Sequence, residues 1–223
     1  MLRRVLRETG TGRGGLAVDI GSGTGHLAVQ LASEGLHIIA IEPLSSMRAH
    51  IPIGPKLHAI GGAAEQLPLQ DHVADLLAAG QAWHWFQARL AAEEAHRVLR
   101  PGGTVLMLWN IFDNTVPWLD RIEQISRARD PRRARGFDPG DMSHLFPAAR
   151  WTPIRRARAV HHHVIERDGL AELVLTSSVF AGLAEHDRSM VREKISAIVS
   201  EQAAKGDTVS VPYQTWAYWT RRR

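Results

Sequence analysis

The pattern of apolar and polar positions predicts short buried strands separated by helices. Near-continuous apolar runs bounded by glycine or proline are typical of parallel strands covered on both faces, and apolar residues at helical spacing indicate helices. Strands are expected at residues 16–20, 36–41, 57–60, 76–79, 104–109, 158–165 and 208–219. Helical patterns occupy residues 26–31, 45–50, 88–99, 117–129, 168–180 and 187–205, after a short basic helix near the start of the chain. This alternation predicts a doubly wound α/β fold.

A glycine-rich turn follows the first strand and is the most informative stretch. Residues 16–25 run Leu-Ala-Val-Asp-Ile-Gly-Ser-Gly-Thr-Gly, and a helix is expected directly afterwards. Glycine lets the chain turn sharply and lets a ligand approach bare backbone, while the N–H groups that begin a helix point at that ligand. The turn lacks the Gly-Lys-Ser/Thr of a phosphate-binding loop, but residues 23–28 still fit a loose dinucleotide pattern. Asp19 favours another ligand, because a carboxylate there would repel a diphosphate and suits a cationic sulfonium with an amino group.

The spacing Asp19-x-Gly21-x-Gly23-x-Gly25 resembles the first motif of the class I S-adenosylmethionine-dependent methyltransferases, here of the methyltransferase domain 11 type. Three later stretches add to the resemblance. They are residues 64–71, similar to the second and third motifs; residues 80–86, similar to the Gln-Ala-x-His-Trp-Phe signature of the trans-aconitate methyltransferase group; and Arg-Val-Leu-Arg-Pro-Gly-Gly at 97–103. The resemblance implies S-adenosylmethionine as cofactor and a Rossmann-like seven-stranded sheet, mostly parallel with the last strand antiparallel.

The cofactor site is expected at the carboxyl ends of the first strands. Glu42 ends the second strand, where its carboxylate could accept from both hydroxyls of a ribose; helix capping is the alternative. Ala63 stands where the family usually has a polar residue for the adenine amino group, so adenine would rely on the backbone around Ala64 and on Glu65. The predicted cofactor-binding residues are Asp19, Gly21, Ser22, Gly23, Gly25, Glu42, Pro43, Ala64, Glu65 and Gln81.

The methyl acceptor is expected next to aromatic residues at the same edge of the sheet. Trp83, Trp85 and Asn110 are predicted to bind it, although packing of the next helix is the alternative for the tryptophans. His84 is the candidate catalytic base, since histidine titrates near neutral pH, with capping or packing as its alternative. A hydroxyl acceptor needs such a base, whereas a carboxylate acceptor needs none and could be held by arginine.

Composition narrows the possible partners. The chain has 223 residues, no cysteine, and a formal net charge of +4 with a pI near 10.1. Its arginines are scattered among 23 acidic residues except at 132–135 and 221–223, so a solvated basic surface is favoured over a nucleic-acid site. Strand alternation separates His162 from His161 and His163, so no metal site is expected. No apolar run is long enough for a membrane span, which predicts a cytoplasmic protein, monomeric or homodimeric, acting on a small molecule.

The sequence predicts a single domain over residues 1–223. It divides into a cofactor half at about 1–110, a substrate or lid region at about 111–160, and C-terminal strands and helices at 158–223. Pro212 places the last strand at a sheet edge or a bulge, because proline lacks an N–H. Fifteen residues precede the first strand, fewer than the family's helical flap needs, which indicates a shortened start.

Three functions stay open at this point. The first is S-adenosylmethionine-dependent methyl transfer to a carboxylate or hydroxyl of a small metabolite or natural product. The second is a catalytically impaired, methyltransferase-like binding module with a shortened N-terminal flap. The third is an RNA or other nucleotide methyltransferase, against which stands the lack of an Asn/Asp-Pro-Pro-Tyr run after the fourth strand.

Overall fold

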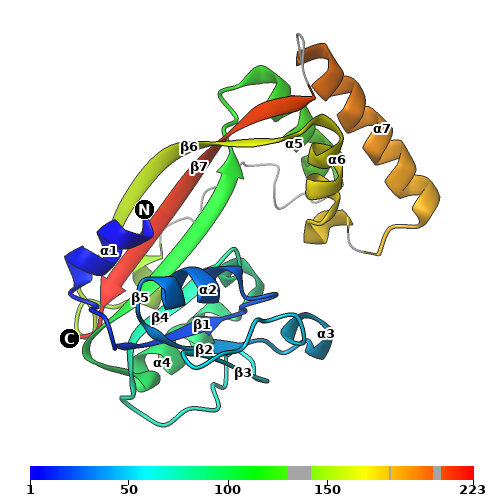
Figure 1. Cartoon of the computed structure of the whole chain (residues 1–223). Coiled ribbons are helices and arrows are strands. Elements are labelled where there is room, and N and C mark those ends of the chain that lie inside the picture. The colour runs from blue at the N-terminus through cyan, green and yellow to red at the C-terminus, as the bar shows by residue number, and fades with distance from the viewer. Residues whose placement is uncertain (130–141, 181, 203–206) are drawn as a thin grey trace. The chain divides into compact units, whose positions relative to one another are not determined.

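Seven strands form one mixed sheet, and helices connect them (Figure 1). The computed structural model describes residues 1–129, 142–180, 182–202 and 207–223. The strands are β1 (Leu16–Ile20), β2 (His37–Ile41), β3 (Leu57–Ile60), β4 (Ala74–Gly80), β5 (Leu99–Phe112), β6 (Arg155–Glu166) and β7 (Thr208–Arg221). Their order in the sheet is β3-β2-β1-β4-β5-β7-β6, with β1 to β5 parallel and the last strands antiparallel. The predicted α/β fold class is confirmed.

Helices occupy most of the connections between these strands. They are α1 (Leu2–Thr9), α2 (His26–Ser33), α3 (Ser45–Arg48), α4 (Ala88–Val98), α5 (Pro117–Arg129), α6 (Arg167–Leu175) and α7 (Glu185–Gln202). Short 3-10 turns lie at Trp83–Trp85, Ser143–Leu145 and Ser178–Phe180. No helix in the described ranges is both long and apolar enough to cross a membrane.

The chain divides into two compact units, each with its own hydrophobic core. The first comprises residues 1–109, 139–158 and 216–223, and the second comprises residues 110–138 and 159–215. In the first unit, the strand residues Val18, Leu77 and Leu106 are completely buried, as the continuous apolar runs predicted. Part of the expected lid region, residues 130–141, lies outside the described residues.

Helices supply most of the second core. Its fully buried side chains come from α5, the 3-10 turn at Ser178–Phe180, α6, α7 and β7, and they include Leu119, Leu170, Phe180, Ile195 and Val211. The amphipathic pattern predicted for residues 117–129 therefore reflects packing within this unit.

Two details of the sheet differ from the sequence prediction. β7 lies between β5 and β6, so the expectation that Pro212 marks a sheet edge was wrong, whereas the alternative of a bulge stays a prediction. Proline removes one donor but keeps its acceptor, and the carbonyl of Pro212 accepts from the N–H of Asp113 at 3.0 Å. β5 also begins at Leu99, earlier than expected, because Gly102 and Gly103 pair with the backbone of Arg222.

Candidate active site

The glycine turn joins β1 to α2 in a conformation that requires glycine. Gly21, Gly23 and Gly25 have φ angles of +62°, +58° and +87°, in the left-handed region. Gly21 is also closely approached, since a Cβ there would lie 2.8 Å from the Cβ of Ala82 and 3.0 Å from the ring of Phe86. The segment after β4 therefore packs directly on the first glycine.

Glu42, at the end of β2, fixes this turn. Its side chain is buried, and Oε2 accepts from the N–H of Gly23 while Oε1 accepts from the N–H of Leu44, both at 2.9 Å. Arg48 holds the same corner by donating to the carbonyl of Glu42 at 2.6 Å and to that of Pro43 at 3.3 Å. Each carboxylate oxygen of Glu42 retains a second lone pair, so the expected contact with a ribose stays chemically possible.

Asp19 is the most unusual side chain of the site. It is 1% exposed, and neither carboxylate oxygen has a hydrogen-bond partner. Burial, with a smaller contribution from the carboxylate of Glu42, raises the pKa of Asp19 to about 8; the nearby N–H of Ala28 offsets part of this rise without forming a hydrogen bond of ordinary geometry. A buried carboxyl without partners costs free energy, which a cationic ligand would recover.

Ser22 adds a second unsatisfied polar group to the turn. Its hydroxyl oxygen is buried without a partner, while its backbone N–H donates to the carbonyl of Ile41 at 3.1 Å. Buried polar atoms are normally hydrogen-bonded, so two orphaned groups, one near the end of β1 and one in the turn after it, fit a ligand that pairs with them. The residues present therefore fit a cofactor that carries a positive charge and polar groups.

The loop after β3 carries the residues predicted to meet adenine. Ala64 is 5% exposed, and Glu65 accepts the N–H of Gln87 through Oε1 at 2.8 Å. Glu65 therefore binds the N-cap residue of α4 in this structure, and its expected contact with adenine stays a prediction. The backbone N–H of Gln66 donates to the carbonyl of Ala63 at 3.2 Å.

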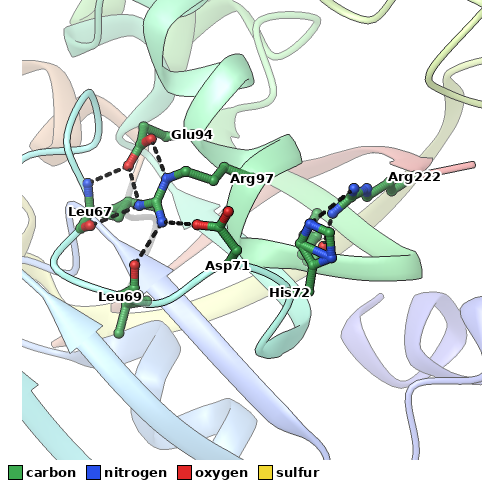
Figure 2. Close-up of polar contacts among 8 residues, drawn as sticks. Leu67, Leu69, Asp71, His72, Glu94, Arg97 and Arg222 are labelled. Atoms are coloured by element: carbon green, nitrogen blue, oxygen red, sulfur yellow. Dashed lines mark hydrogen bonds and ion pairs between the residues drawn. The ribbon is translucent and has the colours of Figure 1, made fainter.

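Arg97 of α4 anchors the same loop, as Figure 2 shows. Its guanidinium donates to both carboxylate oxygens of Glu94, to Asp71 and to the carbonyl of Leu69, all at 2.7 Å, and to the carbonyl of Leu67 at 3.0 Å. Glu94 in turn accepts the N–H of Leu67 at 2.7 Å. The hydrogen bond from Arg97 lowers the pKa of Glu94. The hydrogen bonds to Glu94 and Asp71 in turn raise the pKa of Arg97. The sequence alone gave Arg97 no role of its own, although the acids at 71 and 94 were a visible signal for a partly exposed ion pair.

The aromatic segment after β4 begins at Gln81, whose φ of +57° is rare for a residue other than glycine. Trp83 is 4% exposed and packs against Phe86 and Phe146, with ring centroids 5.8 and 5.9 Å apart. Trp85 is 52% exposed. Trp83 thus packs among other aromatic rings, whereas Trp85 presents its ring to solvent, and the expected contact of each with an acceptor stays a prediction.

His84 is paired with Trp109 of β5. The indole N–H of Trp109 donates to Nδ1 of His84 at 3.4 Å, and the rings of His84 and Trp85 lie 5.0 Å apart. Because an indole nitrogen can only donate, Nδ1 accepts and the neutral imidazole carries its hydrogen on Nε2. The basic nitrogen of the predicted catalytic base is therefore directed at Trp109.

Asn110 belongs to the second unit, whereas the other predicted site residues belong to the first. Its side-chain oxygen accepts from the hydroxyl of Thr215 at 2.7 Å, and that hydroxyl lies 3.3 Å from Nδ1 of His161. The structure therefore describes Asn110 within a polar cluster of its own unit, and its role toward an acceptor stays a prediction.

The histidine triplet shows ordinary structural contacts. His161 and His163 face Tyr213, whereas His162 contacts the hydroxyl of Ser210, as strand alternation predicted. Across the described ranges, no group of three or more His, Cys, Asp or Glu side chains could hold a metal ion.

The side chains of the C-terminal arginines donate hydrogen bonds to backbone carbonyls of the chain. Arg221 donates to the carbonyl of Gly102, Arg222 to that of Leu99, and Arg223 to that of Trp151. Arg222 also reaches His72 in Figure 2. The other predicted basic cluster, residues 132–135, lies outside the described residues.

Several known proteins are similar to this chain in sequence or in fold. Residues 18–107 match the family model for a methyltransferase domain. An uncharacterised methyltransferase of Mycobacterium tuberculosis is 29% identical over 205 residues, which cover 89% of this chain and 79% of that protein. A candidate type II methyltransferase from Anaeromyxobacter dehalogenans shares the fold with a TM-score of 0.65 and 20% identity, over 99% of this chain and 94% of that one. A geranyl diphosphate C-methyltransferase from Streptomyces coelicolor, solved with Mg²⁺, geranyl diphosphate and S-adenosyl-L-homocysteine, has a TM-score of 0.53 and 13% identity over 99% of this chain and 76% of its own.

Proposed function

Since this chain is a class I S-adenosylmethionine-dependent methyltransferase, we propose that it binds S-adenosylmethionine at the glycine turn and methylates a small molecule. The observation that carries the proposal is the buried, unpartnered carboxyl of Asp19 beside the turn. A cationic ligand removes the cost of ionising that carboxyl, and a diphosphate would increase it.

The chain's own residues would hold and orient the cofactor, which supplies an electrophilic methyl group when bound. Asp19 provides negative charge, the glycine turn provides bare backbone, and Glu42 keeps that turn in place while offering its remaining lone pairs. Gln81 and the backbone around Ala64 complete the proposed cofactor contacts. In this scheme catalysis rests on alignment of the two reactants and exclusion of water.

A carboxylate acceptor fits the aromatic segment better than an alcohol. His84 accepts a hydrogen bond from Trp109 through the nitrogen that would otherwise take a proton. An ionised carboxylate needs no base for its attack on the methyl group, whereas an alcohol does. We therefore place carboxylic acids first among candidate acceptors and phenols, which ionise more easily than alcohols, second. The exposed ring of Trp85 is the proposed acceptor contact in this unit. The narrower similarity to the trans-aconitate group stays a prediction.

Binding of S-adenosylhomocysteine, measured by isothermal titration calorimetry, tests the cofactor proposal. We expect the native chain to bind it with a Kd in the micromolar range and Asp19→Asn to lose at least tenfold in affinity, since 1.4 kcal/mol corresponds to about tenfold. Glu93→Gln is the matched control, because Glu93 is a half-exposed carboxylate paired with Arg89 on α4. NAD should not bind. Equal affinity of native chain and Asp19→Asn, or tighter binding of NAD, would contradict the proposal.

Transfer of a radiolabelled methyl group tests the acceptor class and separates the alternatives. Panels of carboxylic acids, phenols and RNA are incubated with the labelled cofactor, and the products are counted. Labelled acids or phenols support small-molecule methylation, and labelled RNA would support the nucleotide alternative. Cofactor binding without transfer to any panel would favour the impaired binding module.

A further inference from the structure

The outer edge of β6 is long and unprotected. β6 is the last strand in the order of the sheet, so alternate residues along its outer side present N–H and C=O groups that pair with no strand of the described chain. Residues 160–164 are all exposed, including Val160 at 51% and Val164 at 63%. Exposed valines on an open edge strand are a template for pairing with another chain.

The two ends of β6 differ in how their outer edge is protected. Near the start of β6, Arg155 forms an ion pair with Glu8 of α1 at 3.0 Å, which ties a helix to that end. Further along, residues 158–166 contain no lysine and no proline, two residues that commonly protect sheet edges. We call residues 158–166, Arg-Ala-Val-His-His-His-Val-Ile-Glu, the edge segment.

The edge segment is nearly symmetric about His162. Suppose that a second copy pairs antiparallel with this strand, with a two-fold axis at His162. Each residue then faces a residue of the other copy, and the two residue numbers add up to 324. Val160 then faces Val164, and Arg158 faces Glu166, so an apolar pair and an ion pair each occur twice. The flanking histidines, 161 and 163, face each other in this register. Cross-strand pairs of this kind stabilise antiparallel sheets, and like charges do not meet.

We propose that the edge segment pairs with the edge segment of a second copy of this chain, joining two sheets through β6. The interface is narrower than the roughly 800 Å² per partner of standard complexes, so the dimer is weak, with a Kd on the order of 10 μM. The proposal is independent of cofactor binding, because it uses no residue of the glycine turn.

Sedimentation equilibrium over a range of protein concentrations measures the dimer. We expect Val164→Lys to raise the dimer Kd at least tenfold, because each dimer contains the altered pair twice and lysine protects an edge. Val29→Lys is the matched control, since Val29 is 42% exposed on α2 and lies outside the edge segment. Circular dichroism melts show whether each variant folds.

Charge reversal tests the register. Arg158→Glu places two acids opposite each other, and Glu166→Arg places two arginines opposite each other, so each single change should weaken the dimer. The double variant Arg158→Glu with Glu166→Arg restores opposite charges and should return the Kd to within about threefold of the native value. A merely destabilised fold would not be rescued in this way.

A single cysteine gives a direct readout, because the native chain has none. In the proposed register His162→Cys faces itself across the axis, within disulfide reach, and should form a covalent dimer on mild oxidation. Val164→Cys is the control, since the two copies of residue 164 lie about 13 Å apart along the strands, too far for a disulfide.

Two results would overturn the proposal. One is a monomer at every concentration up to about 20 times the expected Kd together with no cross-linking of His162→Cys. The other is a dimer that persists unchanged in Val164→Lys and in both single charge reversals, because such a dimer uses a different surface.

Discussion

At the scale of a single residue, the buried carboxyl of Asp19 couples cofactor binding to proton release. The pKa of Asp19 is raised to about 8, so at pH 7 the carboxyl is mostly protonated before a cation arrives. A cation favours the ionised form, and binding should therefore release up to one proton. The affinity for S-adenosylhomocysteine should rise about tenfold per pH unit between pH 6 and 7.5 and level off above about pH 8.

Calorimetry in buffers of different ionisation enthalpy measures the released proton directly. Asp19→Asn is the control, since it shares any titration of the ligand's own groups but lacks the carboxyl. A pH profile identical in both proteins would show that Asp19 does not titrate on binding.

Gly21 allows a second prediction at the residue scale. Gly21→Ala introduces both a left-handed φ of +62° and a Cβ 2.8 Å from Ala82, so we expect a loss of about 2–4 kcal/mol in the free energy of unfolding. Gly14→Ala separates the two causes, because Gly14 has a φ of +83° with nothing within 4 Å of the added Cβ, and it should cost about 1 kcal/mol. Urea unfolding measures both values. Equal losses would mean that the contact with Ala82 relaxes without cost.

At the scale of elements, Arg97 connects α4 to the loop that carries Ala64 and Glu65. Arg97→Lys keeps the charge but cannot donate from a planar fork to Glu94, Asp71 and two carbonyls at once. We expect a loss of about 1–3 kcal/mol in the free energy of unfolding and faster amide exchange in residues 64–72. Arg89→Lys on the same helix alters an exposed ion pair with Glu93 and should change stability by less than about 0.5 kcal/mol.

Exchange measured by mass spectrometry distinguishes a local effect from a global one. If residues 64–72 exchange no faster in Arg97→Lys than in Arg89→Lys, Arg97 does not order the loop.

The elements were predictable from the sequence to the extent that local patterns decide them. Buried parallel strands such as β1 and β2 show as continuous apolar runs, and the turn at Gly21 shows because few other residues fit it. Pro212 led to the wrong expectation that β7 is an edge strand. Proline lacks one N–H and so removes only one hydrogen bond between strands, which an interior strand tolerates. Hydrogen-bond partners were less predictable, since the N–H of Gln87 that Glu65 accepts and the N–H of Gly23 that Glu42 accepts are distant in sequence and are placed only by the tertiary fold.

At the scale of the whole molecule, Asp19 makes the fold less stable as the pH rises. The folded chain keeps a proton on this carboxyl up to about pH 8, whereas the unfolded chain loses it near pH 4. The folded state thus binds more protons between these values, and this contribution to stability falls by about 1.4 kcal/mol per pH unit from about pH 4 to 8, then stays constant. The stability lost is what a bound cation can restore.

Asp19→Asn should remove this dependence without changing the shape of the side chain. We expect its free energy of unfolding to exceed that of the native chain by an amount that is near zero at pH 4 and grows toward pH 8, as measured by urea unfolding at each pH. S-adenosylhomocysteine should then stabilise the native chain most strongly at pH 8 and leave Asp19→Asn nearly unaffected. If the two proteins differ by the same amount at every pH, the carboxyl is not titrating within the fold. Because the variant is expected to be more stable and yet to bind less cofactor, unfolding of the variant cannot explain a loss of binding. Higher stability together with weaker binding in Asp19→Asn would therefore show that Asp19 serves ligand binding and not the stability of the fold.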